Sequence, residues 1–124
     1  MDRAGWEELK SKCPSTVILV SNDGMGSAEE ALRHKLLRTY LAMLLENGLY
    51  PGAMCFYAGG VKMVVDGSPV LDLLKELEAN GARLVICSTC LQYYGLTEKV
   101  AVGIVGGMGD IVLAQWMAAK VITL

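Results

Sequence analysis

Residues 16–26 read T-V-I-L-V-S-N-D-G-M-G, and this stretch sets the class of fold that the sequence predicts. Its first five residues are apolar or β-branched without polar alternation, as is typical of a strand covered on both faces of a sheet. Turn-forming residues follow at once, and apolar residues at helical spacing come next, over residues 27–47. A buried strand that leads through a turn into a helix is the repeating unit of a parallel α/β sheet.

The same unit recurs to the end of the chain. The sequence predicts strands at residues 16–20, 53–57, 83–86, 101–105 and 121–124. It predicts helices at residues 27–47, 69–80 and 110–119, with a turn or short helix at 87–94. Ser27 and Glu30 resemble a capping box at the start of the first helix, and Ser68 and Pro69 resemble the start of the second. Residues 61–65 are apolar and predict either a strand edge or a loop anchor. We therefore expect a three-layer α/β/α domain with a five-stranded parallel sheet over residues 15–124, preceded by an extension at 1–14.

Composition narrows the classes of protein to which the chain can belong. Its 124 residues suit one domain, and 53% of them are hydrophobic although only 6% are aromatic. This aliphatic excess predicts strands buried on both faces and a surface that packs against other subunits. The formal net charge of −2 and the scattered basic residues argue against nucleic acid as a partner.

The sequence also gives an expectation for localisation. No apolar run reaches the roughly 20 residues that a membrane-spanning helix needs. Residues 1–12 are rich in charge and lack the apolar stretch of a signal peptide. We therefore expect a cytoplasmic protein with no membrane partner.

Four cysteines, Cys13, Cys55, Cys87 and Cys90, are the strongest candidates for chemistry. In a reducing compartment they are expected to be free thiols, and their spacing does not suit a four-cysteine zinc site, so we expect no metal and no cofactor. Cys87 and Cys90 lie where a buried strand meets a helical turn. A helix start lowers the pKa of a thiol, and a second thiol three residues on can attack a persulfide or disulfide formed on the first. Alternatively, Cys87 is a small core residue and Cys90 packs beneath the turn.

Two loops at other strand ends supply candidate pocket residues. In the loop after the first strand, Asn22, Asp23 and Gly24 form a tight turn that can line a pocket. That loop lacks the glycine pattern of a phosphate-binding loop, so we do not expect a nucleotide. In the second loop, Gly59 and Gly60 allow the backbone to approach either the cysteine loop or a ligand.

Charged and aromatic residues near the cysteines have two interpretations each. Lys62 can favour a nearby thiolate or persulfide anion, or it is a solvated loop lysine. Tyr94, with Tyr93, flanks the thiols or forms a subunit interface. His34 is the only histidine and falls in the middle of the predicted first helix, so we expect no catalytic role for it.

Several segments together resemble one known family. They are S-N-D-G-M-G after the first strand, F-Y-A-G-G-V-K-M after the second, G-S-P-V-L-D-L-L-K-E-L-E-A-N-G through a helix, C-S-T-C-L-Q-Y-Y-G after the third strand, and G-G-M-G-D-I-V near the end. From residue 16 onward the chain resembles the DsrE/DsrF-like sulfur-relay family, most closely the DsrE-like domain of YedF-type selenium-metabolism proteins. The resemblance implies a five-stranded parallel sheet and a homo-oligomer, a trimer or hexamer.

The resemblance also implies a function. A sulfurtransferase or persulfide carrier would pass sulfur, or selenium, between donor and acceptor proteins. Cys87 has the spacing to Gly95 of the family's relay cysteine, and Cys90 is the second cysteine of a C-G-T-C pattern, in which Ser88 here replaces the glycine. Two alternatives are a non-catalytic oligomeric ligand-binding or scaffold subunit with structural cysteines, and a dithiol–disulfide oxidoreductase.

Overall fold

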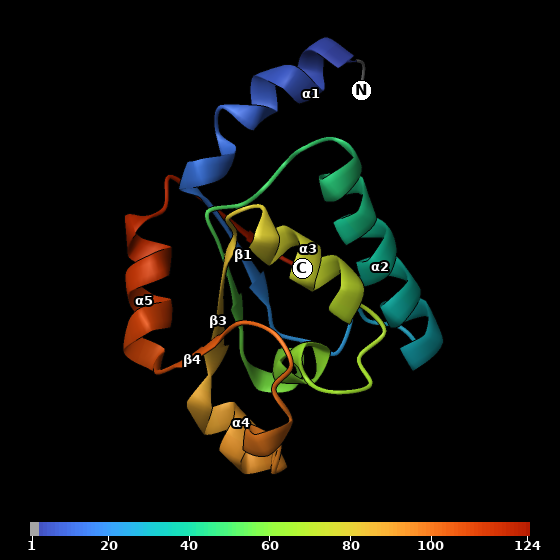
Figure 1. The fold of residues 1–124 in the computed structure, drawn as a ribbon, viewed down its shortest axis with the longest axis vertical. Helices are drawn as coiled ribbons and strands as arrows, with labels where there is room; N and C mark the ends of the chain where they lie inside the picture. The colour runs from blue at the N-terminus through green and yellow to red at the C-terminus, as the bar shows by residue number, and fades with distance from the viewer. Residues whose placement is uncertain (1–2) are drawn as a thin grey trace.

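A computed structural model describes residues 3–124, and in it five parallel strands form one sheet in the order β4-β3-β2-β1-β5 (Figure 1). The strands are β1 (Thr16–Val20), β2 (Ala53–Phe56), β3 (Arg83–Cys87), β4 (Ile104–Gly106) and β5 (Lys120–Thr123). The α-helices are α1 (Arg3–Lys10), α2 (Glu30–Glu46), α3 (Leu71–Ala79), α4 (Ser88–Tyr94) and α5 (Met108–Met117). The 3₁₀ segments are η1 (Cys13–Ser15), η2 (Ala58–Val64) and η3 (Thr97–Lys99).

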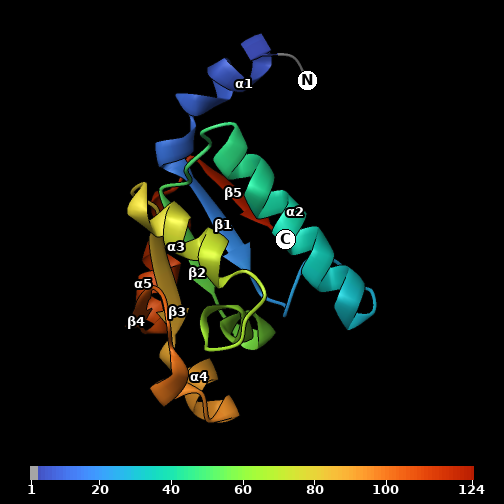
Figure 2. The ribbon, with the colours of Figure 1, turned by 45° about the vertical axis from the view of Figure 1, so that its right-hand side comes forward.

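The helices cover both faces of the sheet, so the predicted three-layer α/β/α class is confirmed. Figures 1 and 2 show α2 and α3 on one face, with α5 on the opposite face. Helix α4 lies beyond the carboxyl end of β3, whereas α1 extends from the other end of the molecule. The expected active edge of a parallel sheet is therefore the end that carries α4 and η2.

The core explains why the strand sequences lack polar alternation. The three central strands β1, β2 and β3 bury nearly every side chain, since helices cover both of their faces. Leu37 and Leu41 of α2 and Leu74 and Leu77 of α3 are at most 1% exposed on one face, and Ile111 of α5 is equally buried on the other. Each such side chain stabilises the fold by roughly 1.5–3 kcal/mol through burial.

Three helix starts differ from the prediction, and one of them is that of α5, which begins at Met108 rather than residue 110. Helix α2 begins at Glu30 rather than residue 27, and no capping box forms because Glu29 is the N-cap residue. Residues 22–28 instead form a bent loop that packs on the first turns of α2. Helix α3 begins at Leu71, and Ser68 accepts a hydrogen bond from the Val70 amide at 3.3 Å just before it.

Two further segments are corrected by the structure. Residues 61–65 belong mainly to the 3₁₀ segment η2, so the loop-anchor interpretation is the one that holds. Strand β4 begins at Ile104 rather than residue 101, because the backbone just before it pairs with the end of η2 instead of with β3. Val100 forms an isolated antiparallel bridge with Val65, and the Ala101 amide donates to the Val64 carbonyl at 2.8 Å. Over residues 3–124, none of the helices combines the length and the apolar character needed to cross a membrane.

Candidate functional site

The cysteine pair lies at the carboxyl end of β3, and its two members have different surroundings. Cys87 is the last residue of β3 and is only 1% exposed, packed within the hydrophobic core. Cys90 is the third residue of α4, half-buried at the margin of that core. Helix α4 ends at Gly95, whose left-handed backbone (φ 67°) provides the predicted stop. Of the two thiols, Cys90 is therefore the one that reaches the surface.

The backbone of the neighbouring segment donates a hydrogen bond to Cys90. The Ala58 amide lies 3.1 Å from Cys90 Sγ, which joins the start of η2 to the first turn of α4. Ala58 has φ 49°, the one positive value outside glycine among the described residues. A left-handed alanine costs on the order of 1 kcal/mol, and such outliers cluster at functional sites. The surrounding structure holds this strained amide against the sulfur.

Two glycines explain how η2 reaches that position. Gly60 is buried against the end of β1, where an added Cβ would overlap the Val20 carbonyl oxygen. An added Cβ at Gly59 would lie 3.4 Å from the Asp23 amide, so this position is also close to the loop after β1. The two glycines thus make their close approach to the β1 end, while the adjacent Ala58 contacts the cysteine loop through Cys90. The segment that carries Ala58 is fixed by backbone packing.

An aromatic and basic group borders the same edge. Lys62 Nζ lies 4.6 Å from the centre of the Tyr94 ring, a cation–π contact between η2 and α4. Tyr94 also meets Tyr93 edge to face, with ring centres 5.2 Å apart. Tyr93 is 81% exposed, so this aromatic corner faces outward beside α4. The structure therefore brings Lys62 of η2 against Tyr94, which lies on the helix that carries Cys90.

Comparison with protein families decides what kind of chain this is. The model of the DsrE/DsrF-like family matches residues 15–124. The chain belongs to the DsrE/DsrF-like family. A search of curated proteins finds no match.

Solved structures share the fold of this DsrE/DsrF-like chain. The ychN protein from E. coli is 19% identical, with a TM-score of 0.65 over 89% of this chain and 99% of its own. MTH1491, a protein of unknown function from Methanobacterium thermoautotrophicum, is 23% identical, with a TM-score of 0.62 over 88% and 97%. BT1422, a protein of unknown function from Bacteroides thetaiotaomicron, is 14% identical, with a TM-score of 0.61 over 91% and 97%. These likenesses support the fold.

The electrostatic environment of Cys90 differs from the prediction for a helix start. Partial burial raises the pKa of the Cys90 thiol, and the side chain of Cys87 raises it further. The Ala58 amide lowers the pKa of Cys90 but does not outweigh these effects. The expectation of a lowered pKa is therefore wrong, because desolvation at the core margin exceeds the stabilisation of the thiolate by nearby amides. Burial likewise raises the pKa of Cys13 and of Cys55.

The loop after β1 is built around Arg33, a residue that the sequence analysis did not single out. Arg33 forms an ion pair with Asp23 at 3.0 Å and donates to the Ala28 carbonyl, while its own carbonyl accepts from the Met25 amide at 3.0 Å. Gly24 is buried with φ 137°, where an added Cβ would overlap Arg33. These contacts fix the loop on the first turns of α2.

Asn22 and Asp23 have different roles in that loop. The Asn22 side chain donates to the Gly26 carbonyl at 3.0 Å and accepts from the Asp23 amide at 2.9 Å, so it holds the turn together. Asp23 lines a cavity of about 210 Å³ that Lys62 and His34 also border. His34 is thus close to a strand end, one helical turn after the start of α2, and not mid-helix as the sequence predicted. The spacing of Glu30 and His34, four residues apart, is the signal that could have indicated it.

Proposed function

We propose that this DsrE/DsrF-like protein is a sulfur carrier, a sulfurtransferase in which Cys90 accepts and releases a sulfane sulfur atom. The observation that carries the proposal is a half-buried thiol at a sheet's carboxyl edge, held by the strained Ala58 amide at 3.1 Å. Family membership supports a sulfur-relay role. The cavity beside Lys62 and the Tyr94 contact lie at the same edge.

The proposed exchange needs only thiols. The Cys90 thiolate attacks the outer sulfur of a donor protein's persulfide, the donor S–S bond breaks, and the donor leaves as a thiolate. Cys90 then carries the persulfide until an acceptor thiolate attacks its outer sulfur and regenerates the Cys90 thiolate. An amide that donates to sulfur favours its anionic form, so Ala58 supports both the attacking thiolate and the departing one.

Selenium is a finer hypothesis for the cargo. It depends on the resemblance of C-S-T-C and S-N-D-G-M-G to the YedF-type selenium-metabolism subgroup. The thiol exchange written above applies to selenium as well as to sulfur. Competition between a persulfide donor (R–S–SH) and a selenopersulfide donor (R–S–SeH), each of which releases its thiolate when Cys90 attacks the outer atom, distinguishes the two cargoes when the adduct is weighed by intact mass.

A second candidate function is a non-catalytic oligomeric subunit, and specific observations favour it. Cys87 is enclosed in the core, and burial raises the pKa of Cys90, as expected of structural cysteines. In addition, α5 and β4 expose Ile104, Met108, Leu113, Trp116 and Met117, each at more than half of its surface. Helix α5 has a single charged side chain, Asp110, which accepts a hydrogen bond from the Gly107 amide at 3.0 Å.

We propose a second copy of this chain as the occupant of that α5–β4 face, in either functional candidate. The exposed fractions of Leu113 and Trp116 are 62% and 85%, too large an apolar area to leave uncovered on one helix. A trimer or hexamer is the assembly that we expect. A homo-oligomer repeats the same predominantly apolar surface at each interface, which suits side chains that need an apolar partner.

Intact-mass measurement separates the functional candidates. The reduced protein is incubated with a sulfane-sulfur donor, alongside C90S and C87S variants. The carrier proposal predicts a gain of one sulfur atom in the wild type and in C87S, and none in C90S. A loss of two hydrogens, with a reversible bond between Cys87 and Cys90, would instead identify an oxidoreductase, and no change in mass would favour the structural subunit.

A further inference from the structure

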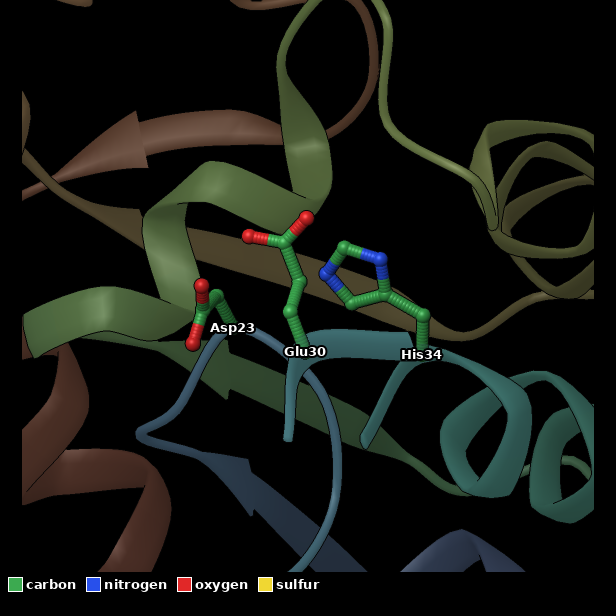
Figure 3. Close-up of side chains that lie close together, drawn as sticks. All are labelled: Asp23, Glu30 and His34. Carbon is green, nitrogen blue, oxygen red and sulfur yellow. The ribbon is translucent and has the colours of Figure 1, made fainter. Parts of the chain in front are cut away.

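Three potential metal ligands converge where the loop after β1 meets the start of α2. Glu30 is the first residue of α2, His34 follows one turn later on the same face, and Asp23 extends from the loop. Ligand atoms from the three side chains all lie within 4.8 Å of one another. Figure 3 shows the imidazole of His34 turned toward the carboxylate of Glu30, with the carboxylate of Asp23 on the other side of Glu30.

The hydrogen bonds of these side chains leave ligand positions open. His34 Nε2 is shielded from solvent and has no hydrogen-bond partner among the described residues. Buried polar atoms normally have a partner, and no protein group in the described part of the chain occupies this nitrogen, so its lone pair is available to a metal ion. Asp23 uses Oδ1 in its ion pair with Arg33, so its second carboxylate oxygen is available. The Glu30 side chain, which is exposed, forms no ion pair within residues 3–124.

We propose that Asp23, Glu30 and His34 bind a divalent first-row transition metal ion, with Zn²⁺ as the best match. One imidazole nitrogen with two carboxylate oxygens suits Zn²⁺, Mn²⁺ or Fe²⁺ and disfavours Ca²⁺ and Mg²⁺, which take oxygen ligands alone. Three protein ligands leave at least one coordination position open. Metal–ligand distances of about 2.0–2.2 Å place tetrahedral ligand atoms about 3.4 Å from one another. Atoms that now lie up to 4.8 Å apart must therefore close by up to about 1.4 Å, a movement that the exposed Glu30 side chain allows.

The local charge and the adjoining space are consistent with such an ion. Asp23, Glu30 and the nearby Asp66 carry negative charge, against the positive charges of Arg33 and Lys62. The three proposed ligands border the cavity of about 210 Å³ that reaches Lys62, so the open coordination position faces a space that can hold a small ligand. Because none of the three is a cysteine, the site is independent of the role proposed for Cys90.

Cobalt(II) titration of the full, reduced chain tests the site, because Co²⁺ reports its ligands by colour. We expect one equivalent of Co²⁺ to bind with visible d–d bands and without the strong near-ultraviolet band of thiolate ligation. E30Q and H34Q are expected to lower the affinity by about tenfold or more. E46Q removes the same charge as E30Q from the other end of α2 and is expected to bind as the wild type does.

Three results would overturn the proposal. They are no bound Co²⁺, a thiolate band that disappears in C90S, and equal affinity in the wild type, E30Q and H34Q. Circular dichroism of each variant establishes that it is folded. Glu30 is exposed, so E30Q keeps the test valid should H34Q fail to fold.

Discussion

Substituting Gly60 by alanine tests how the Cys90 site is held together. The added methyl group would overlap the carbonyl of Val20 and approach the Ser21 amide at 3.2 Å. Both neighbours are backbone of the β1 end, so no side-chain rotation can relieve the overlap. Segment η2 must therefore move away from β1, and the Ala58 amide moves with it.

The structure gives the size of the expected effect. Overpacking a well-packed core costs about 1–3 kcal/mol, and a backbone-to-backbone overlap belongs at the upper end of that range. For a chain of this length, about 3 kcal/mol corresponds to a fall in Tm of roughly 10 °C. Loss of the Ala58 hydrogen bond removes an effect that lowers the pKa of Cys90, so that pKa should rise further above its ordinary value.

Two measurements check this prediction together. Thermal unfolding followed by circular dichroism gives the Tm, and the rate of Cys90 alkylation as a function of pH gives the thiol's titration. Gly109 is the control, because an added Cβ there meets nothing within 4 Å. It lies in α5, where alanine is a better helix former than glycine, so G109A should not lower the Tm and should keep the alkylation profile of Cys90. A G60A variant that melts within about 2 °C of the wild type would refute the proposed packing of η2 on β1.

Three other predictions follow from contacts away from Gly60. The C87A variant should shift the alkylation profile of Cys90 to lower pH, because the Cys87 side chain raises the pKa of Cys90. An unchanged profile would mean that the two thiols do not interact. Asp72 joins α3 to Arg38 of α2 through contacts of 2.8 and 2.9 Å, which lower its pKa to about 2. This pair stabilises the fold at pH values above the ordinary carboxyl pKa near 4, and the stabilisation is lost as the pH falls toward 2. D72N should therefore flatten the acid side of a curve of unfolding free energy against pH, measured by urea unfolding. An unchanged slope would contradict this prediction. W116E places a charge on the α5–β4 face and should reduce the mass found by light scattering, whereas a wild-type chain that is already monomeric would disprove self-association through that face.

The fold could be predicted because its strands leave little ambiguity. Strands β1, β2 and β3 read as continuous apolar runs, and this pattern requires a sheet that is covered on both faces. Boundaries were less accurate where tertiary contacts override local signals. Ser27 resembles a helix cap, but Arg33 holds the preceding loop against α2 and delays the helix until Glu30.

The place of Cys90 in the fold could be predicted, whereas the electrostatics of this candidate site could not. The sequence places Cys90 at a strand end, whereas the partial burial that raises its pKa depends on how α4 packs on the core. The contact between the Ala58 amide and Cys90 joins residues 32 positions apart, and the left-handed backbone of Ala58 is not indicated by the sequence of a non-glycine residue. The grouping of His34 with Asp23 depends on a helix start three residues later than predicted.

Mapping the site of persulfide formation in the native protein tests the central claim most directly. The chain is treated with a sulfane-sulfur donor, labelled with a persulfide-selective tag before unfolding, and digested for peptide mass spectrometry. Sulfur carriage by Cys90 predicts the tag on Cys90, with Cys13, Cys55 and Cys87 unlabelled. A tag on any of those three in place of Cys90, or a fully unlabelled chain, would contradict it.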